Sequence, residues 1–115
     1  MKTLRCTFEM EIDVQFENPE ASEAYFIRGD WKETFYDLDD LEQVAEHLAD
    51  GFHHESDSWD TEAKAHYRMV EGFGYFYDQK DGTYKTDEKT AGWIGGAYIS
   101  IRYECKLTTA GTCEV

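Results

Sequence analysis

The sequence has few of the residues that mark several common classes of protein. Its 115 residues include one proline and three cysteines, and no two cysteines stand at CxxC spacing. No apolar run approaches the roughly 20 residues that a membrane-spanning helix needs. The chain begins with a strand-like pattern and no secretion signal precedes it. We therefore expect a cytoplasmic protein with no disulfide framework and no membrane contact. Cys6 and Cys105 fall at inward strand positions and are expected to be core thiols, whereas Cys113 is expected to be inert.

Basic residues are also scarce. The chain has 11 Lys and Arg against 25 Asp and Glu, a formal net charge of −14. The imbalance lies in the first half: residues 9–62 hold 18 acidic and two basic residues, whereas residues 63–115 hold seven of each. Because binding to a phosphate backbone needs a basic surface, we expect no direct binding to nucleic acid.

Recognisable catalytic and metal-binding motifs are missing as well. There is no HExxH, zinc-finger, EF-hand or Gly-x-Ser-x-Gly pattern. The glycine-rich stretch 92–96 precedes a predicted strand rather than a helix, so it lacks the phosphate-binding geometry of a helix N-terminus. The histidines near carboxylates are read as solvated residues, not as ligands; they are His47, His53, His54 and His66. We predict no enzyme activity, no cofactor and no metal site.

What is present indicates a folded chain. Aromatic residues make up 16% of the sequence, and the length suits a single domain over residues 1–115. Residues 4–16 alternate strictly, with apolar residues at even positions and polar or charged residues at odd positions. This period of two predicts one long, half-buried strand. We expect the rest of the sheet to be organised around it.

Two helices are expected to follow. Asn18 and Pro19 form a helix start and Gly29 a stop, which predicts a short helix between them. Apolar residues at three- and four-residue spacing predict a second helix over residues 38–52, capped by Asp37 or Asp39. The intervening residues 30–37 are expected to be an extended connector.

The remaining chain predicts further strands. Residues 65–78 read as a strand interrupted by Gly72 and Gly74, and Asp81-Gly82 is the strongest hairpin signal. Residues 83–85 can pair briefly, and residues 97–107 alternate like the first strand. Arg102 and Lys106 are expected to face the acidic side of that first strand. The expected fold is α+β, in the order β-α-α-β-β: an antiparallel sheet of three or four long strands with two helices packed on one face.

The density of carboxylates is the strongest functional signal. They occur on the outer face of a predicted strand, on the outer face of a predicted helix and in the loop that follows. In size and charge the chain resembles the small acidic inhibitors that phages and mobile elements direct at nucleases and CRISPR complexes, although no motif is shared. The hypothesis is a non-enzymatic inhibitor that binds a basic, nucleic-acid-handling defence protein. Nucleic-acid mimicry is one form that such inhibition can take. The expected contact residues are Glu9, Glu11, Asp13, Asp40, Glu46, Asp50, Asp57 and Asp60.

Other interpretations remain open at this point. The acid can equally match another basic partner, as in an immunity-type or regulatory protein that neutralises a toxin. A small hydrolase or metal-binding protein is a weaker alternative. The simplest interpretation is a solvated, charged surface.

Overall fold

The computed structural model describes residues 1–104 and 107–115. Over these residues the chain is mostly β-structure, with eight strands in two antiparallel sheets. The strands are β1 (Leu4–Met10), β2 (Asp13–Phe16), β3 (Ser58–Asp60), β4 (Ala65–Val70), β5 (Gly74–Asp78), β6 (Thr83–Thr86), β7 (Ile99–Arg102) and β8 (Leu107–Glu114). The helices are α1 (Pro19–Ser22), the π-helical turn η1 (Glu23–Ile27), α2 (Trp31–Thr34), α3 (Leu41–His54) and α4 (Glu88–Trp93).

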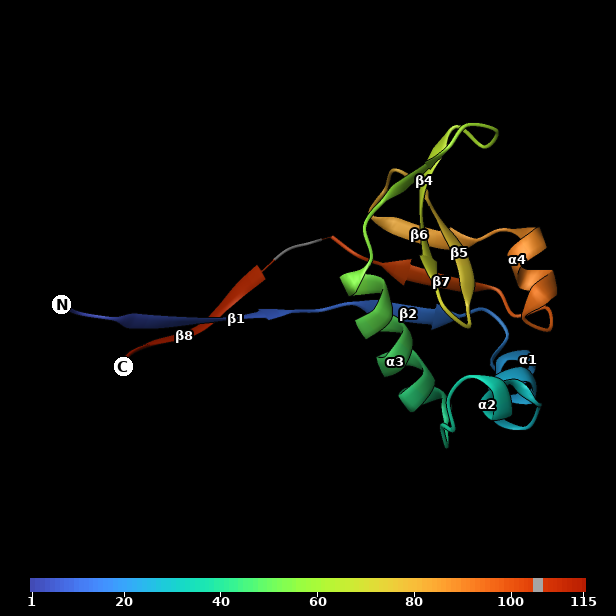
Figure 1. Cartoon of the computed structure of the whole chain (residues 1–115), viewed down its shortest axis with the longest axis horizontal. Helices are drawn as coiled ribbons and strands as arrows, with labels where there is room; N and C mark the ends of the chain where they lie inside the picture. The colour runs from blue at the N-terminus through green and yellow to red at the C-terminus, as the bar shows by residue number, and fades with distance from the viewer. Residues whose placement is uncertain (105–106) are drawn as a thin grey trace.

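The expected fold of three or four long strands under two helices is wrong. Six strands form the main sheet in the order β2-β7-β6-β5-β4-β3, and β1 pairs with β8 in a separate two-stranded ribbon. Figure 1 shows this ribbon extending away from the rest of the molecule, so we call β1 and β8 the arm and the remainder the body. The sequence pattern did not reveal the difference because each predicted long run is divided between shorter strands.

The predicted strand over residues 4–16 shows how this happens. It is interrupted after Met10 and resumes at Asp13, and its two parts pair with different strands. In β2 the expected faces are correct, since Val14 and Phe16 pack against the core. In β1 the expected burial is wrong: Leu4 and Phe8 are exposed because no layer covers the arm among the described residues.

The later strand predictions change for similar reasons. The run 65–78 folds back on itself at Gly72, whose φ of +87° favours glycine, and becomes the antiparallel pair β4–β5. The hairpin at Asp81-Gly82 is confirmed and joins β5 to β6. The run 97–107 provides β7 and the start of β8, with Cys105 and Lys106 outside the described residues.

The core lies between the main sheet and α3. On one side Val44, Leu48 and Phe52 of α3 are fully buried, and on the other Phe76 and Ile101 of the sheet are fully buried. This confirms that the second predicted helix packs its apolar face on the sheet. The interior also includes aromatic side chains from η1, α2 and the turn before β5, namely Phe26, Trp31 and Phe73.

Local signals set the helix starts. The Asn18 side chain accepts a hydrogen bond from the Ala21 backbone N–H, as expected for an N-cap. The cap of α3 is Asp40 rather than Asp37 or Asp39, because the Asp40 carboxylate accepts from the Gln43 N–H at 2.9 Å. The expected connector over residues 30–37 contains α2, whose Trp31 indole donates to the Gly72 carbonyl at 2.7 Å.

Candidate acidic interface

Three of the predicted contact residues line one groove at the base of the arm. Glu9 on β1, Asp13 on β2 and Glu11 between the strands face this groove, which has a volume of about 350 Å³. They share it because side chains two residues apart in an extended chain point to the same side. The rest of the lining consists of Arg102, Glu104 and Thr108. Glu104 was not among the predicted contact residues, since it follows a strand that is distant in sequence.

The groove carries an excess of negative charge. Asp13 lies opposite Arg102 in the β2–β7 register, which confirms the expected placement of Arg102 beside the acidic strand face. Arg102, however, forms its ion pair with Glu104, at 3.3 Å. Among residues 1–104 and 107–115, no ion pair reaches Glu9, Glu11 or Asp13. Within the described residues, these three exposed carboxylates therefore form no ion pair.

The acidic residues of α3 lie on a different side of the molecule. Ile12 and Val14 pack against the core that includes α3, so Glu11 and Asp13, which alternate with them, point away from α3. Glu46 is exposed, and Asp50 is exposed with its carboxylate 3.5 Å from His54 Nδ1. The structure therefore does not bring the strand and helix carboxylates together into a single surface.

Asp40, also a predicted contact residue, has a local structural role. Its carboxylate caps α3, and the neighbouring Asp39 N–H donates to the Gln43 side chain at 2.9 Å. The two bonds satisfy backbone N–H groups at the start of the helix.

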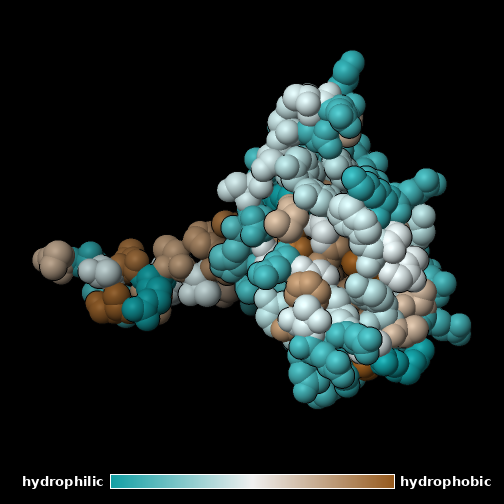
Figure 2. Space-filling model, turned by 45° about the vertical axis from the view of Figure 1, so that its right-hand side comes forward, coloured by the Kyte–Doolittle hydropathy of each residue, from teal (hydrophilic) through white to brown (hydrophobic). Residues whose placement is uncertain are grey.

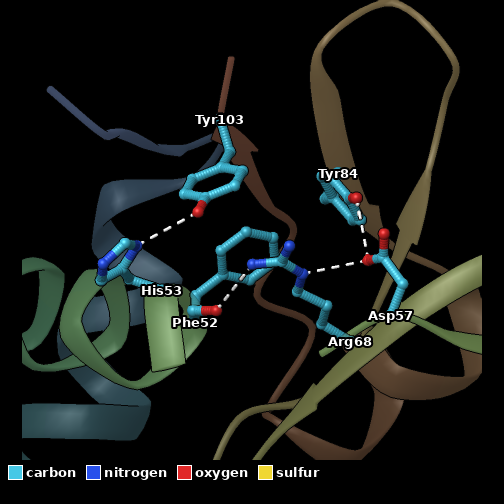
Figure 3. A network of polar contacts seen from close by, with 6 residues as sticks. All are labelled: Phe52, His53, Asp57, Arg68, Tyr84 and Tyr103. Carbon is cyan, nitrogen blue, oxygen red and sulfur yellow. Dashed lines mark hydrogen bonds and ion pairs between the residues drawn. The ribbon is translucent and has the colours of Figure 1, made fainter. Parts of the chain in front are cut away.

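Asp57 is held by an internal network rather than left available to a partner (Figure 3). Arg68 Nε donates to Asp57 Oδ1 at 3.0 Å, and the Tyr84 hydroxyl donates to the same oxygen at 2.9 Å. The Arg68 guanidinium also donates to the Phe52 carbonyl at 3.0 Å and lies over the Phe52 and Tyr103 rings. Burial, followed by the bond to Asp57, raises the pKa of Tyr84 to about 12. The network ties the loop after α3 to the main sheet.

Asp60 is similarly engaged within its own loop. It accepts from the backbone N–H groups of Glu62 and Ala63 and from the Tyr77 hydroxyl. The Ala63 bond, and next the Tyr77 bond, hold the pKa of Asp60 below its usual range. Sequence reasoning treated Asp57 and Asp60 as free because their side-chain partners, Arg68, Tyr84 and Tyr77, are distant in the chain.

A second concave region lies where β3, β4, β5 and α4 meet. Its volume is about 360 Å³, and aromatic side chains dominate its lining. Lys89 Nζ lies 5.2 Å from the centre of the Trp93 ring, so a cation of this chain already contacts one of these aromatic faces. Alternation in residues 65–78 was the only sequence signal for part of this cleft. The residues lining it are Trp59, Asp60, Thr61, Tyr67, Tyr75, Tyr77, Asp87, Lys89, Thr90 and Trp93.

In the described residues, no group of three or more His, Cys, Asp or Glu side chains is arranged to hold a metal ion. The metal-free interpretation of His47, His53, His54 and His66 stays a prediction. No helix in the same part of the chain is long and apolar enough to cross a membrane.

Comparisons with protein-family models, with curated proteins and with solved structures found no match to this chain.

Proposed function

We propose that this chain is a non-enzymatic inhibitor that binds a basic, nucleic-acid-handling protein, of the kind used in host defence. The supporting observation is the groove at the base of the arm. It presents Glu9, Glu11 and Asp13 with no ion pair among the described residues, and Arg102, the cation among its described lining residues, is already paired with Glu104. A basic segment entering this groove gains charge partners without breaking an internal bond to those three carboxylates.

The spacing of these carboxylates supports mimicry of nucleic acid. Same-face residues of an extended chain are about 6.6 Å apart, since each residue advances the chain by about 3.3 Å. The phosphates of one DNA strand advance by about 3.4 Å per step along the helix axis, and because the strand also winds around that axis, successive phosphates are farther apart than this rise. Glu9, Glu11 and Asp13 therefore form a row of negative charges whose spacing is of the same order as that of phosphates. A protein groove that follows a phosphate backbone would meet a similar row.

The charge of the whole chain acts at longer range. A net charge of −14 on 115 residues attracts a positively charged partner and increases the association rate. Screening shortens this attraction to roughly 8–10 Å near physiological ionic strength. Binding that depends on the groove should therefore weaken as salt is raised.

The proposed contact surface is smaller than the sequence alone suggested. It contains Glu9, Glu11, Asp13 and Glu104. The exposed carboxylates of α3 lie on another side and form a separate, weaker candidate. Asp57 and Asp60 are left out of this surface because internal hydrogen bonds already engage Asp57 Oδ1 and both carboxylate oxygens of Asp60.

Binding to a defined cation provides the first test. A decalysine peptide is titrated into the wild type and into the groove variant Glu9→Gln/Glu11→Gln/Asp13→Asn, followed by calorimetry at about 50 and 200 mM salt. We expect the groove variant to bind about tenfold more weakly, and wild-type binding to fall with salt. The control variant is Glu62→Gln/Glu71→Gln/Glu88→Gln, which removes the same charge from exposed sites in other parts of the body. Equal losses in both variants would contradict a specific role for the groove.

Inhibition is tested on purified enzymes. A panel of RNA-guided and restriction nucleases is assayed for DNA cleavage with the wild type, the groove variant and the control variant. An inhibited nuclease should regain activity with the groove variant only, and its DNA should compete with the inhibitor. If the groove variant inhibits as well as the wild type, the groove is not the contact surface. If DNA remains bound in the inhibited complex, mimicry is wrong while inhibition stands.

A further inference from the structure

The arm exposes an apolar face that an isolated two-stranded ribbon does not explain. Leu4, Phe8 and Leu107 are 56%, 53% and 58% exposed, and all three lie on β1 or β8. In Figure 2 the arm shows brown, hydrophobic residues, whereas the visible face of the body is mainly white and teal. A two-stranded ribbon is at best marginally stable in water, and each of its strands has a free hydrogen-bonding edge.

The arm also differs from the body in charge. In residues 1–10 and 107–115, Lys2 and Arg5 balance Glu9 and Glu114, so the arm segments have no net side-chain charge. The whole net charge of −14 lies in residues 11–106. Along β1 the outer half is basic and the base is acidic. An antiparallel copy of the same strand would therefore place basic residues beside acidic ones.

We infer that β1 pairs antiparallel with β1 of a second copy of this chain, about a twofold axis at Thr7. The two ribbons would then form one four-stranded sheet in the order β8-β1-β1-β8. The interface is isologous, since the same strand edge serves in both copies. The inference does not rest on the proposed function, although the two share Glu9; Glu11, Asp13 and Glu104 of the groove take no part in the pairing of the arms.

The sequence of β1 complements itself in this register. Arg5 of each copy lies opposite Glu9 of the other, which provides two opposite-charge pairs on one face. On the other face Leu4 lies opposite Met10, and Cys6 opposite Phe8. Each exposed apolar side chain of β1 thus gains an apolar neighbour, with Cys6 acting as a small hydrophobe.

The backbone hydrogen-bonding groups on the free edge of β1 also match in this register. The Val115 N–H donates to the Thr3 carbonyl, so the backbone groups of odd-numbered residues in β1 face β8. The register shifts between Thr7 and Phe8, but the extra residue, Ala110, belongs to β8, so the alternation along β1 continues. Those of even-numbered residues face outward and form the free edge. A twofold axis at Thr7 pairs even residues with even residues, so the free N–H and C=O groups of the two copies meet.

Geometry favours a second copy despite the repulsion between two acidic bodies. Each body begins about six residues from Thr7, or about 20 Å along an extended chain, on opposite sides of the axis. The bodies are therefore about 40 Å apart, several times the screening length at physiological salt. The arms, whose side-chain charges sum to zero, can meet while the charged bodies stay separated.

A charge-exchange experiment tests the pairing. Sedimentation equilibrium is measured on the full chain at concentrations from about 1 to 500 μM. The wild type should dimerise, and Arg5→Glu or Glu9→Arg alone should each weaken dimerisation about tenfold because like charges then face each other twice. An equimolar mixture of the two single variants should recover a dimer, as should the double variant Arg5→Glu/Glu9→Arg. Recovery by mixing also shows that the single variants are folded. The control Lys85→Glu, an equal charge change on an exposed residue of β6, should leave dimerisation unchanged.

Cross-linking tests the register. Thr7→Cys is introduced with Cys6→Ser, Cys105→Ser and Cys113→Ser, and oxidation should give a disulfide-linked dimer because the two Thr7 positions lie opposite each other. The matched control is Thr108→Cys in the same background, on β8 of the same arm, which should not cross-link.

A monomeric wild type at 500 μM, or mixed variants that fail to associate, would overturn the inference. Preferential cross-linking at Thr108 would place the contact on β8 and overturn it too.

Discussion

Arg68 on β4 donates a hydrogen bond to the carboxylate of Asp57, in the loop between α3 and β3, with a 3.0 Å separation. The Arg68 side chain is 12% exposed and that of Asp57 is 39% exposed, so the pair lies at the edge of the core. The same carboxylate accepts from Tyr84, and the guanidinium lies over two aromatic rings. The pair therefore belongs to the structural framework, although Asp57 reads in the sequence as one more exposed acid.

The first prediction concerns this pair. Arg68→Ala should lower the free energy of unfolding by about 2–3 kcal/mol, because it removes charged hydrogen bonds and the contact with the Phe52 and Tyr103 rings. Asp57→Ala should cost about 1–3 kcal/mol for the same network. Chemical denaturation checks both values. The control Glu55→Ala, an exposed acid two residues earlier, should change stability by about 0.5 kcal/mol or less.

The second prediction compares the body with the arm. Leu48→Ala should cost about 2–5 kcal/mol, since Leu48 is fully buried and its truncation leaves a cavity. Phe8→Ala should cost about 1 kcal/mol or less when measured at about 1 μM, where arms do not associate. Denaturation of the two variants at that concentration provides the comparison. Equal losses would mean that the arm packs on a core in the monomer.

The third prediction separates helix capping from partner binding. Asp40→Ala should destabilise the chain by about 0.5–2 kcal/mol, because the Gln43 N–H loses its acceptor. Asp40→Asn removes the charge but keeps a cap, so it should retain most of the stability. Thermal unfolding monitored by circular dichroism measures both. A loss with Asp40→Asn as large as with Asp40→Ala would show that charge, not capping, matters at this position.

The fourth prediction concerns alkaline pH. Tyr84 has a usual pKa of 10.0 that is raised to about 12 in the folded chain, mainly by burial and then by the bond to Asp57. As pH rises, the unfolded chain therefore loses the proton of the Tyr84 hydroxyl at a lower pH than the folded chain does. The contribution of protonated Tyr84 to the free energy of unfolding is complete below pH 10 and is lost as pH rises through about 12. Denaturation midpoints measured from pH 8 to 12 should fall less steeply in Tyr84→Phe than in the wild type. Identical slopes would contradict a raised pKa at Tyr84.

Local sequence signals determined several elements of this protein. Apolar spacing in α3, the cap at Asn18 and the Asp81-Gly82 hairpin depend on residues close together in the chain, so they could be predicted. The inward face of β2, the apolar side of β7 and the excess of acid in the first half were likewise readable. The sequence also indicated that Arg102 would face the acidic strand if the two strands were neighbours, and the β2–β7 pairing makes them so.

Only the tertiary structure decided which strands pair and which acids are free. Alternation in residues 4–16 is the same whether they form one strand or two collinear strands, so the separation of β1 from β2 depends on pairing with the distant β8 and β7. Burial follows from that choice, and Phe8 is exposed while Val14 packs on the core. Asp57 and Asp60 are bound by Arg68 and Tyr77, whereas Glu9, Glu11 and Asp13 come together with Glu104 in one groove. Contacts between segments far apart in the chain set these outcomes, and a local pattern of polarity does not contain them.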